Sequence, residues 1–346
     1  MEGEPNGAEQ KTPQTLEPWY RILRLPLLLT IPGEPVAGFL LASAASGQSK
    51  PLGVMLAAVG AALFFAVFGH LLNDLLDLSI DETAHPDRPL PSGEITVPQA
   101  RMAAVVSVLS GLNLALFAGR PVLYAGVVLC CLLLARHAFL KRIPVIGACT
   151  AGLCRALSFL FGVLAVMPDW ISSGRFLESD GALLWVALAC VTLYTAAVAH
   201  LARRAEKKDG GRMRYHCVSL GSSFVQHRAG KKDRGGMRWL PLAVLLPYLA
   251  GLMLLASLRQ NGEAAVSASK TAATSALAFL SAVALLRGWL LGGILYRSQP
   301  IKATVFGHFG NLLLIQGALC SAAGTAGLFP AVTFILLSVL FARFRR

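Results

Sequence analysis

Residues 54–80 read VMLAAVGAALFFAVFGHLLNDLLDLSI. The part that ends at Leu72 contains no Asp, Glu, Lys or Arg, and about 20 apolar residues in a helix cross the hydrocarbon core of a bilayer. The stretch then carries Asn73, Asp74 and Asp77, which are costly to bury in lipid. We therefore expect a membrane-spanning helix whose polar end lies at one surface of the membrane.

Apolar runs of similar length recur along almost the whole chain. They cover approximately residues 20–44, 54–80, 97–118, 121–140, 145–167, 181–203, 238–258, 270–291, 303–322 and 326–343. Of the 346 residues, 55% are hydrophobic and 14% are charged, whereas about a quarter are charged in soluble domains. The mean hydropathy is +0.62. These features exclude a water-soluble fold and predict an all-α integral membrane protein with nine to ten transmembrane helices.

The beginning of the chain differs from the rest. Residues 1–18 are polar, with four glutamates and a single lysine, Lys11. They lack the basic segment and the cleavage site of a secretory leader. We therefore expect residues 1–18 to form a polar tail and residues 19–346 to form one membrane domain.

The excess of positive charge is concentrated in one connection between spans. The chain has 31 Lys and Arg against 18 Asp and Glu, a formal charge of +13, and residues 203–238 hold eleven basic and three acidic side chains. Aromatic side chains on which nucleic-acid bases would stack are nearly absent there, so we expect membrane lipids and no nucleic acid as partners. The positive-inside rule makes this segment a cytoplasmic loop of a multi-pass protein of the inner cell membrane.

The polar end of the second span continues as NDLLDLSID over residues 73–81. At about 100° per residue along a helix, Asn73, Asp77 and Asp81 share one face, and Asp74 lies beside them. Carboxylates that repel one another near a bilayer are stabilised by a cation between them, and hard oxygen ligands favour Mg²⁺. Substrate phosphates usually complete such a site, which indicates a diphosphate-bearing lipid such as an isoprenyl diphosphate. The alternative is that these acids only cap the helix at the membrane surface.

The segment that follows is a short proline-rich loop, HPDRPLPSG, at residues 85–93. Its prolines stop the helix and stiffen the loop. The planar guanidinium of Arg88 is suited to diphosphate oxygens. Taken alone, however, an arginine beside prolines is also typical of a surface turn.

The motif NDxxDxxxD, followed closely by RPLPSG, resembles the UbiA superfamily of intramembrane prenyltransferases. The resemblance covers most of the chain and implies an all-helical fold of about nine spans around a central cavity. It also implies that Asn73, Asp77 and Asp81 bind a prenyl diphosphate through Mg²⁺, with Asp74 adjacent. Arg88 is then a contact of the diphosphate.

A further family element, YxxxK after the fourth span, matches HAFLK at residues 137–141. The match implies that Lys141 is a phosphate ligand and that His137 stands in place of the tyrosine. We therefore expect Asp77, Asp81 and Lys141 to be the catalytic residues.

The sequence departs from the family at its second motif, a DxxxD pair in the loop after the sixth span. Only Glu206 and Asp209 offer carboxylates there, and lysines lie between them. The stretches GLCRAL at 152–157 and LYTAAV at 193–198 resemble the EboC-like branch, which also lacks an evident second motif. The expected function is Mg²⁺-dependent transfer of a prenyl group from a prenyl diphosphate to a hydrophobic or aromatic acceptor. The alternative is a catalytically reduced member that carries or exports a lipophilic intermediate.

Two polar residues within the apolar runs each have two open roles. Arg155 lies about ten residues into its span, where a charge needs a partner. It either faces the cavity and binds diphosphate or pairs with a polar residue of another helix. His200, at a helix end, either removes the acceptor proton or is a structural residue.

Overall fold

The computed structural model describes residues 16–171, 179–208, 240–261, 268–292 and 301–343. Within these ranges all regular structure is helical, which confirms the predicted all-α class. The helices are α1 (Glu17–Leu23), α2 (Leu25–Leu28), α3 (Gly33–Ser46), α4 (Leu52–Leu76), α5 (Leu78–Ala84), α6 (Val97–Ala118), α7 (Arg120–Ala138), η1 (Leu140–Arg142), α8 (Pro144–Val166), α9 (Ser179–Lys208), α10 (Leu240–Asn261), α11 (Ala268–Gly292), α12 (Ile301–Ala322), η4 (Thr325–Gly327) and α13 (Leu328–Arg343).

Eight spans in the described ranges are long and apolar enough to cross a membrane. Two further helices, α10 and α13, carry the shorter apolar stretches Leu240–Met253 and Leu328–Phe341. Each of the ten apolar runs in the sequence therefore corresponds to one helix or to consecutive helices, such as α1 to α3 for the first run and α4 with the start of α5 for the second. The protein is a multi-pass integral membrane protein, in agreement with the predicted bundle of nine to ten spans.

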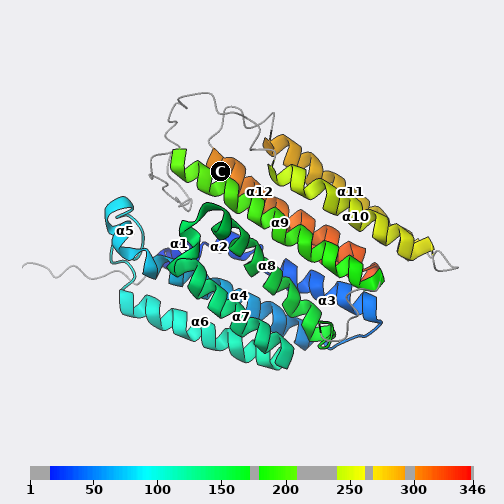
Figure 1. Ribbon diagram of the computed structural model, residues 1–346, viewed down its shortest axis with the longest axis horizontal. Helices are drawn as coiled ribbons and strands as arrows, with labels where there is room; N and C mark the ends of the chain where they lie inside the picture. The colour runs from blue at the N-terminus through cyan, green and yellow to red at the C-terminus, as the bar shows by residue number, and fades with distance from the viewer. Residues whose placement is uncertain (1–15, 172–178, 209–239, 262–267, 293–300, 344–346) are drawn as a thin grey trace, which may run out of the picture.

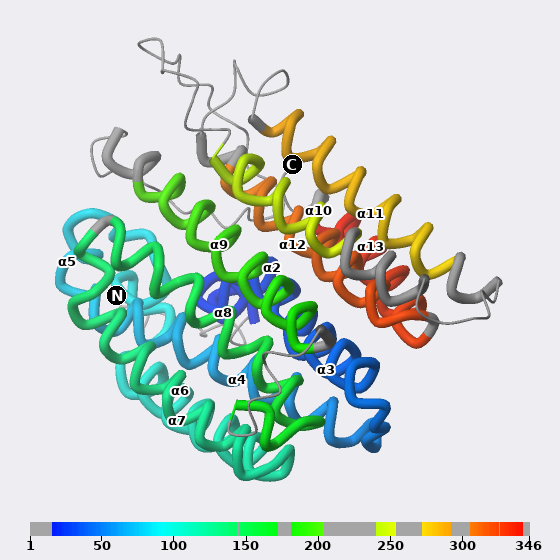
Figure 2. The backbone as a smooth tube through the Cα atoms, turned by 45° about the vertical axis from the view of Figure 1, so that its right-hand side comes forward, coloured from blue at the N-terminus to red at the C-terminus, as the bar shows by residue number. Residues whose placement is uncertain are grey.

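The long helices pack side by side in two groups (Figure 1). In the first group, α4 packs against α6 and α7, and α3 packs against α8. In the second, α12 packs against α11 and α13, and α9 packs against α10. Contacts of α8 with α9 and of α12 with α3 join the two groups. The short helix α5 lies at one end of the bundle in both views (Figures 1 and 2).

Glycines allow α3 and α8 to approach backbone to backbone. A Cβ atom on Gly38 would collide with the backbone carbonyl of Phe159, and one on Gly162 would collide with that of Pro35. Such small residues are what close helix packing in lipid requires, since van der Waals contact replaces the hydrophobic effect there. The close contact fixes α3 and α8 against each other.

The first span is discontinuous, whereas the sequence suggested one continuous apolar run. Helix α1 ends at Arg24, which has a left-handed backbone (φ 51°, ψ 52°), and the short α2 follows it. Pro32 then precedes α3 and lacks the N–H group that would continue a helix. The span therefore contains a non-helical connection near Thr30, whose polar backbone groups need partners from other helices.

The second span also differs from the expectation of a single helix face. Helix α4 ends at Leu76, and Asp77 (φ −95°, ψ 1°) separates it from α5. The helical hydrogen bonds nevertheless continue across the junction, because the Asp77 and Asp81 amides donate to carbonyls four residues earlier, at 3.0 and 2.8 Å. The acidic motif is thus spread over two helices, and its carboxylates turn toward different neighbours.

Candidate active site

Asp74 lies in the last turn of α4 and pairs with a residue from the start of the chain. Its side chain is almost buried, and its Oδ1 accepts hydrogen bonds from Arg24 Nη2 at 2.6 Å and from Asn73 Nδ2 at 3.0 Å. Arg24 occupies the left-handed junction between α1 and α2. Sequence reasoning did not identify Arg24 as a site residue, because nothing in its local pattern relates it to an aspartate 50 positions away.

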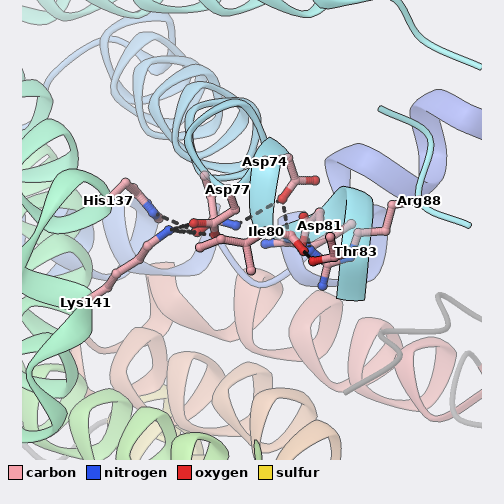
Figure 3. A network of polar contacts seen from close by, with 10 residues as sticks. Asp74, Asp77, Ile80, Asp81, Thr83, Arg88, His137 and Lys141 are labelled. Atoms are coloured by element: carbon pink, nitrogen blue, oxygen red, sulfur yellow. Dashed lines mark hydrogen bonds and ion pairs between the residues drawn. The ribbon is translucent and has the colours of Figure 1, made fainter. Parts of the chain in front are cut away.

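Asp77 pairs with Lys141 of η1. The Lys141 ammonium donates to both carboxylate oxygens of Asp77, at 2.6 and 2.7 Å, and to Asn73 Oδ1 at 3.2 Å (Figure 3). His137 Nδ1 lies 3.0 Å from the same Asn73 oxygen. The residues 137–141, which matched the family's YxxxK element, therefore do lie at the acidic motif.

Asp81 pairs with Arg88 from the proline-rich loop (Figure 3). The Asp81 side chain is nearly buried, at 4% exposure. Burial raises the pKa of the Asp81 carboxyl above its usual value, and the positive charge of Arg88 opposes this shift. The loop is itself held to α1 by an ion pair between Arg21 and Glu94, which fixes the position of Arg88 over the acidic motif.

The three carboxylates and three cations balance one another in charge. Each aspartate faces a cation from a different segment, and no three His, Cys, Asp or Glu side chains of the described ranges are grouped closely enough to hold a metal ion. Mg²⁺, however, is commonly held by one or two carboxylates together with water and substrate phosphates. The donor set consists of carboxylate and amide oxygens, which suit Mg²⁺, and its cations suit phosphate. The residues present therefore fit a metal-bound diphosphate.

Arg155 lies in a separate cluster. Its guanidinium donates to Glu34 Oε1 at 2.7 Å, to the Thr30 carbonyl at 2.8 Å and to the Thr30 hydroxyl at 2.6 Å. Of the two roles that the sequence left open, these contacts favour pairing with a polar residue of another helix. Its predicted contact with the diphosphate receives no support from this geometry.

The degenerate second motif falls mostly outside the described residues. Asp209 and the loop up to residue 239 lie outside them, and the side chain of Glu206 is not described either. Whether this pair binds a second metal therefore stays a prediction, as does membership of the EboC-like branch.

The fold and the site define a class: a polytopic helical membrane protein with a cluster of paired acids and bases at one end of its bundle. The model of the UbiA prenyltransferase family matches residues 35–287, which is most of the chain. The chain belongs to the UbiA prenyltransferase family, as its motifs suggested.

Sequence relatives align with a part of the chain. The digeranylgeranylglyceryl phosphate synthase of Methanoculleus marisnigri is 28% identical over 166 residues, which cover 48% of this chain and 55% of that protein. The protein of the same name from Methanococcus maripaludis is 36% identical over 100 residues, 29% of this chain and 35% of that protein. The chain thus spans about half, or less, of the length of these curated relatives.

Solved structures match almost the whole chain. A UbiA homologue from Archaeoglobus fulgidus, bound to DMAPP and Mg²⁺, has a TM-score of 0.53 at 16% identity, covering 94% of this chain and 97% of that one. The apo structure of a UbiA homologue from Aeropyrum pernix K1 has a TM-score of 0.55 at 17% identity. The match covers 84% of this chain and 96% of that one. At these identities the likeness establishes the fold.

Proposed function

We propose that the protein transfers an isoprenyl group from a prenyl diphosphate to a lipophilic acceptor and depends on Mg²⁺. The observation that supports this most directly is the set of three aspartate–cation pairs at one end of the bundle. A prenyl diphosphate needs a metal and cationic donors for its head and an apolar environment for its chain. The aspartates of the pairs offer ligands for the metal, the arginines and the lysine offer the cationic donors, and the surrounding membrane bundle offers the apolar environment.

In this proposal Asn73, Asp77 and Asp81 hold the metal, and Asp74 supports them. When bound, Mg²⁺ neutralises the diphosphate and favours its departure from the allylic carbon. Lys141 turns its hydrogen bonds from the Asp77 carboxylate toward phosphate oxygens as the substrate enters. The Asp77 carboxylate would thereby become free to bind the metal. One movement of Lys141 would then make both the phosphate ligand and the metal ligand available.

Arg88 and Arg24 act in the same way on the other aspartates. Each pairs with a carboxylate and presents N–H donors that suit phosphate oxygens. In the transfer step, the bond between the prenyl carbon and the diphosphate oxygen breaks and its electron pair leaves with the diphosphate. The acceptor then donates an electron pair to the prenyl carbon and loses a proton.

We propose a hydrophobic or aromatic acceptor that reaches the site from the membrane. The similarity to proteins named digeranylgeranylglyceryl phosphate synthase adds glyceryl phosphate lipids to the acceptors worth testing. The length of the prenyl chain and the choice of acceptor depend on the apolar surroundings of the prenyl carbon.

We further propose that the site faces the cytoplasm from the inner cell membrane. Basic residues gather at its end of the bundle: Lys141 and Arg142 lie in η1, and Arg203 near the end of α9 donates to the Ile143 carbonyl at 2.9 Å. Basic connections stay on the cytoplasmic side of a membrane. The expected orientation therefore agrees with the predicted cytoplasmic position of the loop that follows α9.

The test is Mg²⁺-dependent release of diphosphate by purified protein in lipid nanodiscs, with prenyl diphosphates of increasing length and with aromatic, quinone-like and glyceryl phosphate acceptors. Asp77→Asn should abolish release and leave the thermal unfolding of the bundle unchanged within a few degrees. Asp87→Asn changes an exposed carboxylate of the neighbouring loop and is the matched control. Retention of wild-type release by Asp77→Asn would overturn the site. Wild-type protein that binds the donor and never releases diphosphate would indicate the carrier function instead.

A further inference from the structure

The side-chain amide of Asn73 has a definite orientation in the candidate site. Its Nδ2 donates to Asp74 Oδ1 at 3.0 Å, and its Oδ1 accepts from Lys141 Nζ at 3.2 Å. A half-turn of the amide would place its NH₂ group against the ammonium, which only donates, and its oxygen against the carboxylate, which only accepts. The contacts on both sides therefore keep the Asn73 oxygen turned toward Lys141.

A second group of the same segment contacts this oxygen. His137 Nδ1 lies 3.0 Å from Asn73 Oδ1, and His137 and Lys141 point to the acidic motif from the same side (Figure 3). Because a carbonyl oxygen only accepts, the hydrogen of this contact is on Nδ1. An amide oxygen has two lone pairs, so His137 and Lys141 together use both of them.

A glycine on α4 gives the His137 ring its place. Gly69 precedes Asn73 by four residues, which is about one helical turn. A Cβ atom on Gly69 would lie 3.1 Å from Leu133 Cδ2, closer than ordinary van der Waals contact, and 3.9 Å from His137 Nε2. The ring therefore lies along α4 with Nε2 beside Gly69 and Nδ1 at Asn73, and this placement selects the nitrogen that donates.

We infer that His137 is a positioning residue, whose Nδ1–H group holds the Asn73 oxygen in the orientation in which it binds a metal. The inference rests on the proposed function, in which Asn73 is a metal ligand and Lys141 turns toward phosphate. The departure of Lys141 frees one lone pair of the Asn73 oxygen for Mg²⁺, and the other stays with His137. Hydrogen bonds that orient a metal ligand in this way contribute about 10- to 100-fold to metal affinity.

The contact depends on where the donor is attached to the side chain. In histidine, Nδ1 is bonded directly to Cγ, whereas the hydroxyl of a tyrosine, which the family element has at this position, lies at the far end of the ring. Asparagine also carries its NH₂ group on Cγ, and glutamine carries it one carbon further out. Replacement of His137 by these two amides therefore keeps the same chemical group and changes only its position.

The test is the affinity for Mg²⁺ of the protein in nanodiscs, measured with a non-reacting prenyl thiodiphosphate. His137→Ala should bind Mg²⁺ about 10- to 100-fold more weakly than the wild type. His137→Asn should restore the affinity to within about threefold, and His137→Gln should resemble His137→Ala. The control Phe139→Ala removes an exposed ring of the same segment and should bind Mg²⁺ as the wild type does.

Two further measurements need neither metal nor turnover. In metal-free protein with ¹⁵N-labelled histidine, nitrogen NMR should show a hydrogen on Nδ1 of His137, whose signals are identified by their loss in His137→Asn. Thermal unfolding of every variant should stay within a few degrees of the wild type, so that a loss of affinity reports the site and not the fold.

Wild-type affinity in His137→Ala would overturn the inference and leave the proposed function standing. Equal affinities of His137→Asn and His137→Gln would overturn it as well, because the position of the donor would then not matter. A His137 ring without hydrogen on Nδ1 would do the same. If His137→Ala does not fold, the comparison of the two amides decides alone. Failure of the wild-type protein to bind Mg²⁺ with the thiodiphosphate would instead overturn the proposed function, and the inference with it.

Discussion

Lys141 donates to both carboxylate oxygens of Asp77, at 2.6 and 2.7 Å, although 64 positions separate the two residues in the sequence. In the proposed function, the pair brings a cation for phosphate and a carboxylate for the metal into one contact. Since each group is the partner of the other, binding of a metal at Asp77 and binding of phosphate at Lys141 would both have to replace the same ion pair. The binding of Mg²⁺ and the binding of diphosphate should therefore be coupled.

This coupling predicts opposite effects of one substitution on two ligands. Lys141→Gln removes the cation that competes for Asp77, so the protein should bind Mg²⁺ alone more tightly than the wild type does. The same variant should bind a prenyl thiodiphosphate with Mg²⁺ about 10- to 100-fold more weakly, because a charge-assisted hydrogen bond contributes about 1.5–3 kcal/mol. Titration calorimetry on the protein in nanodiscs measures both the affinity for Mg²⁺ alone and the affinity for the thiodiphosphate with Mg²⁺.

The neighbouring Arg142 supplies the control for Lys141. Arg142 is exposed and belongs to the same short helix, so Arg142→Gln removes an equal charge from the same surface. It should change neither affinity by more than about twofold. A parallel fall of both affinities in Lys141→Gln would show that Lys141 supports the site without competing for Asp77.

Substitutions of Arg24 and Asp74 should have non-additive effects on the stability of the folded protein. Removing one partner of a fully buried ion pair costs about 3–5 kcal/mol; Arg24 is partly exposed, so its loss should cost less than that but still more than the loss of both partners together. Arg24→Gln should therefore lower the unfolding temperature more than the double variant Arg24→Gln/Asp74→Asn does. A double-mutant cycle on thermal unfolding measures the difference. Additive effects of the two changes would contradict the pairing.

The sequence predicted the ten apolar segments and the place of the acidic motif, because hydropathy and short spacings are local properties. It did not predict the partners, because these depend on how distant segments pack. Arg24 reaches Asp74 across 50 positions, and Arg155 reaches Glu34 across 121. The break at Asp77 was missed for a related reason, since a helical wheel assumes an uninterrupted helix.

The orientation of the bundle can be tested with single cysteines. The loop that contains Asp87 lies at the acidic end of the bundle, and the loop that contains Gln48 follows α3, away from that end (Figure 2). If the basic end is cytoplasmic, a membrane-impermeant thiol reagent added to intact cells should label Gln48→Cys and not Asp87→Cys. Both variants need a background in which the exposed Cys131 and Cys149, together with Cys217 of the basic segment 203–238, are replaced by serine.

The pH dependence of metal binding should reflect Asp81. Burial raises the pKa of its carboxyl, and only the ionised form binds a metal. As the pH falls, the protein should therefore lose Mg²⁺ affinity at a higher pH than an exposed aspartate, with its pKa of about 3.9, would produce. Arg88 opposes the shift, so Arg88→Gln should move the loss to a still higher pH. In a protein that already carries Asp81→Asn, adding Arg88→Gln should no longer change the pH at which Mg²⁺ affinity is lost. If that pH still changes, the titrating group is another residue.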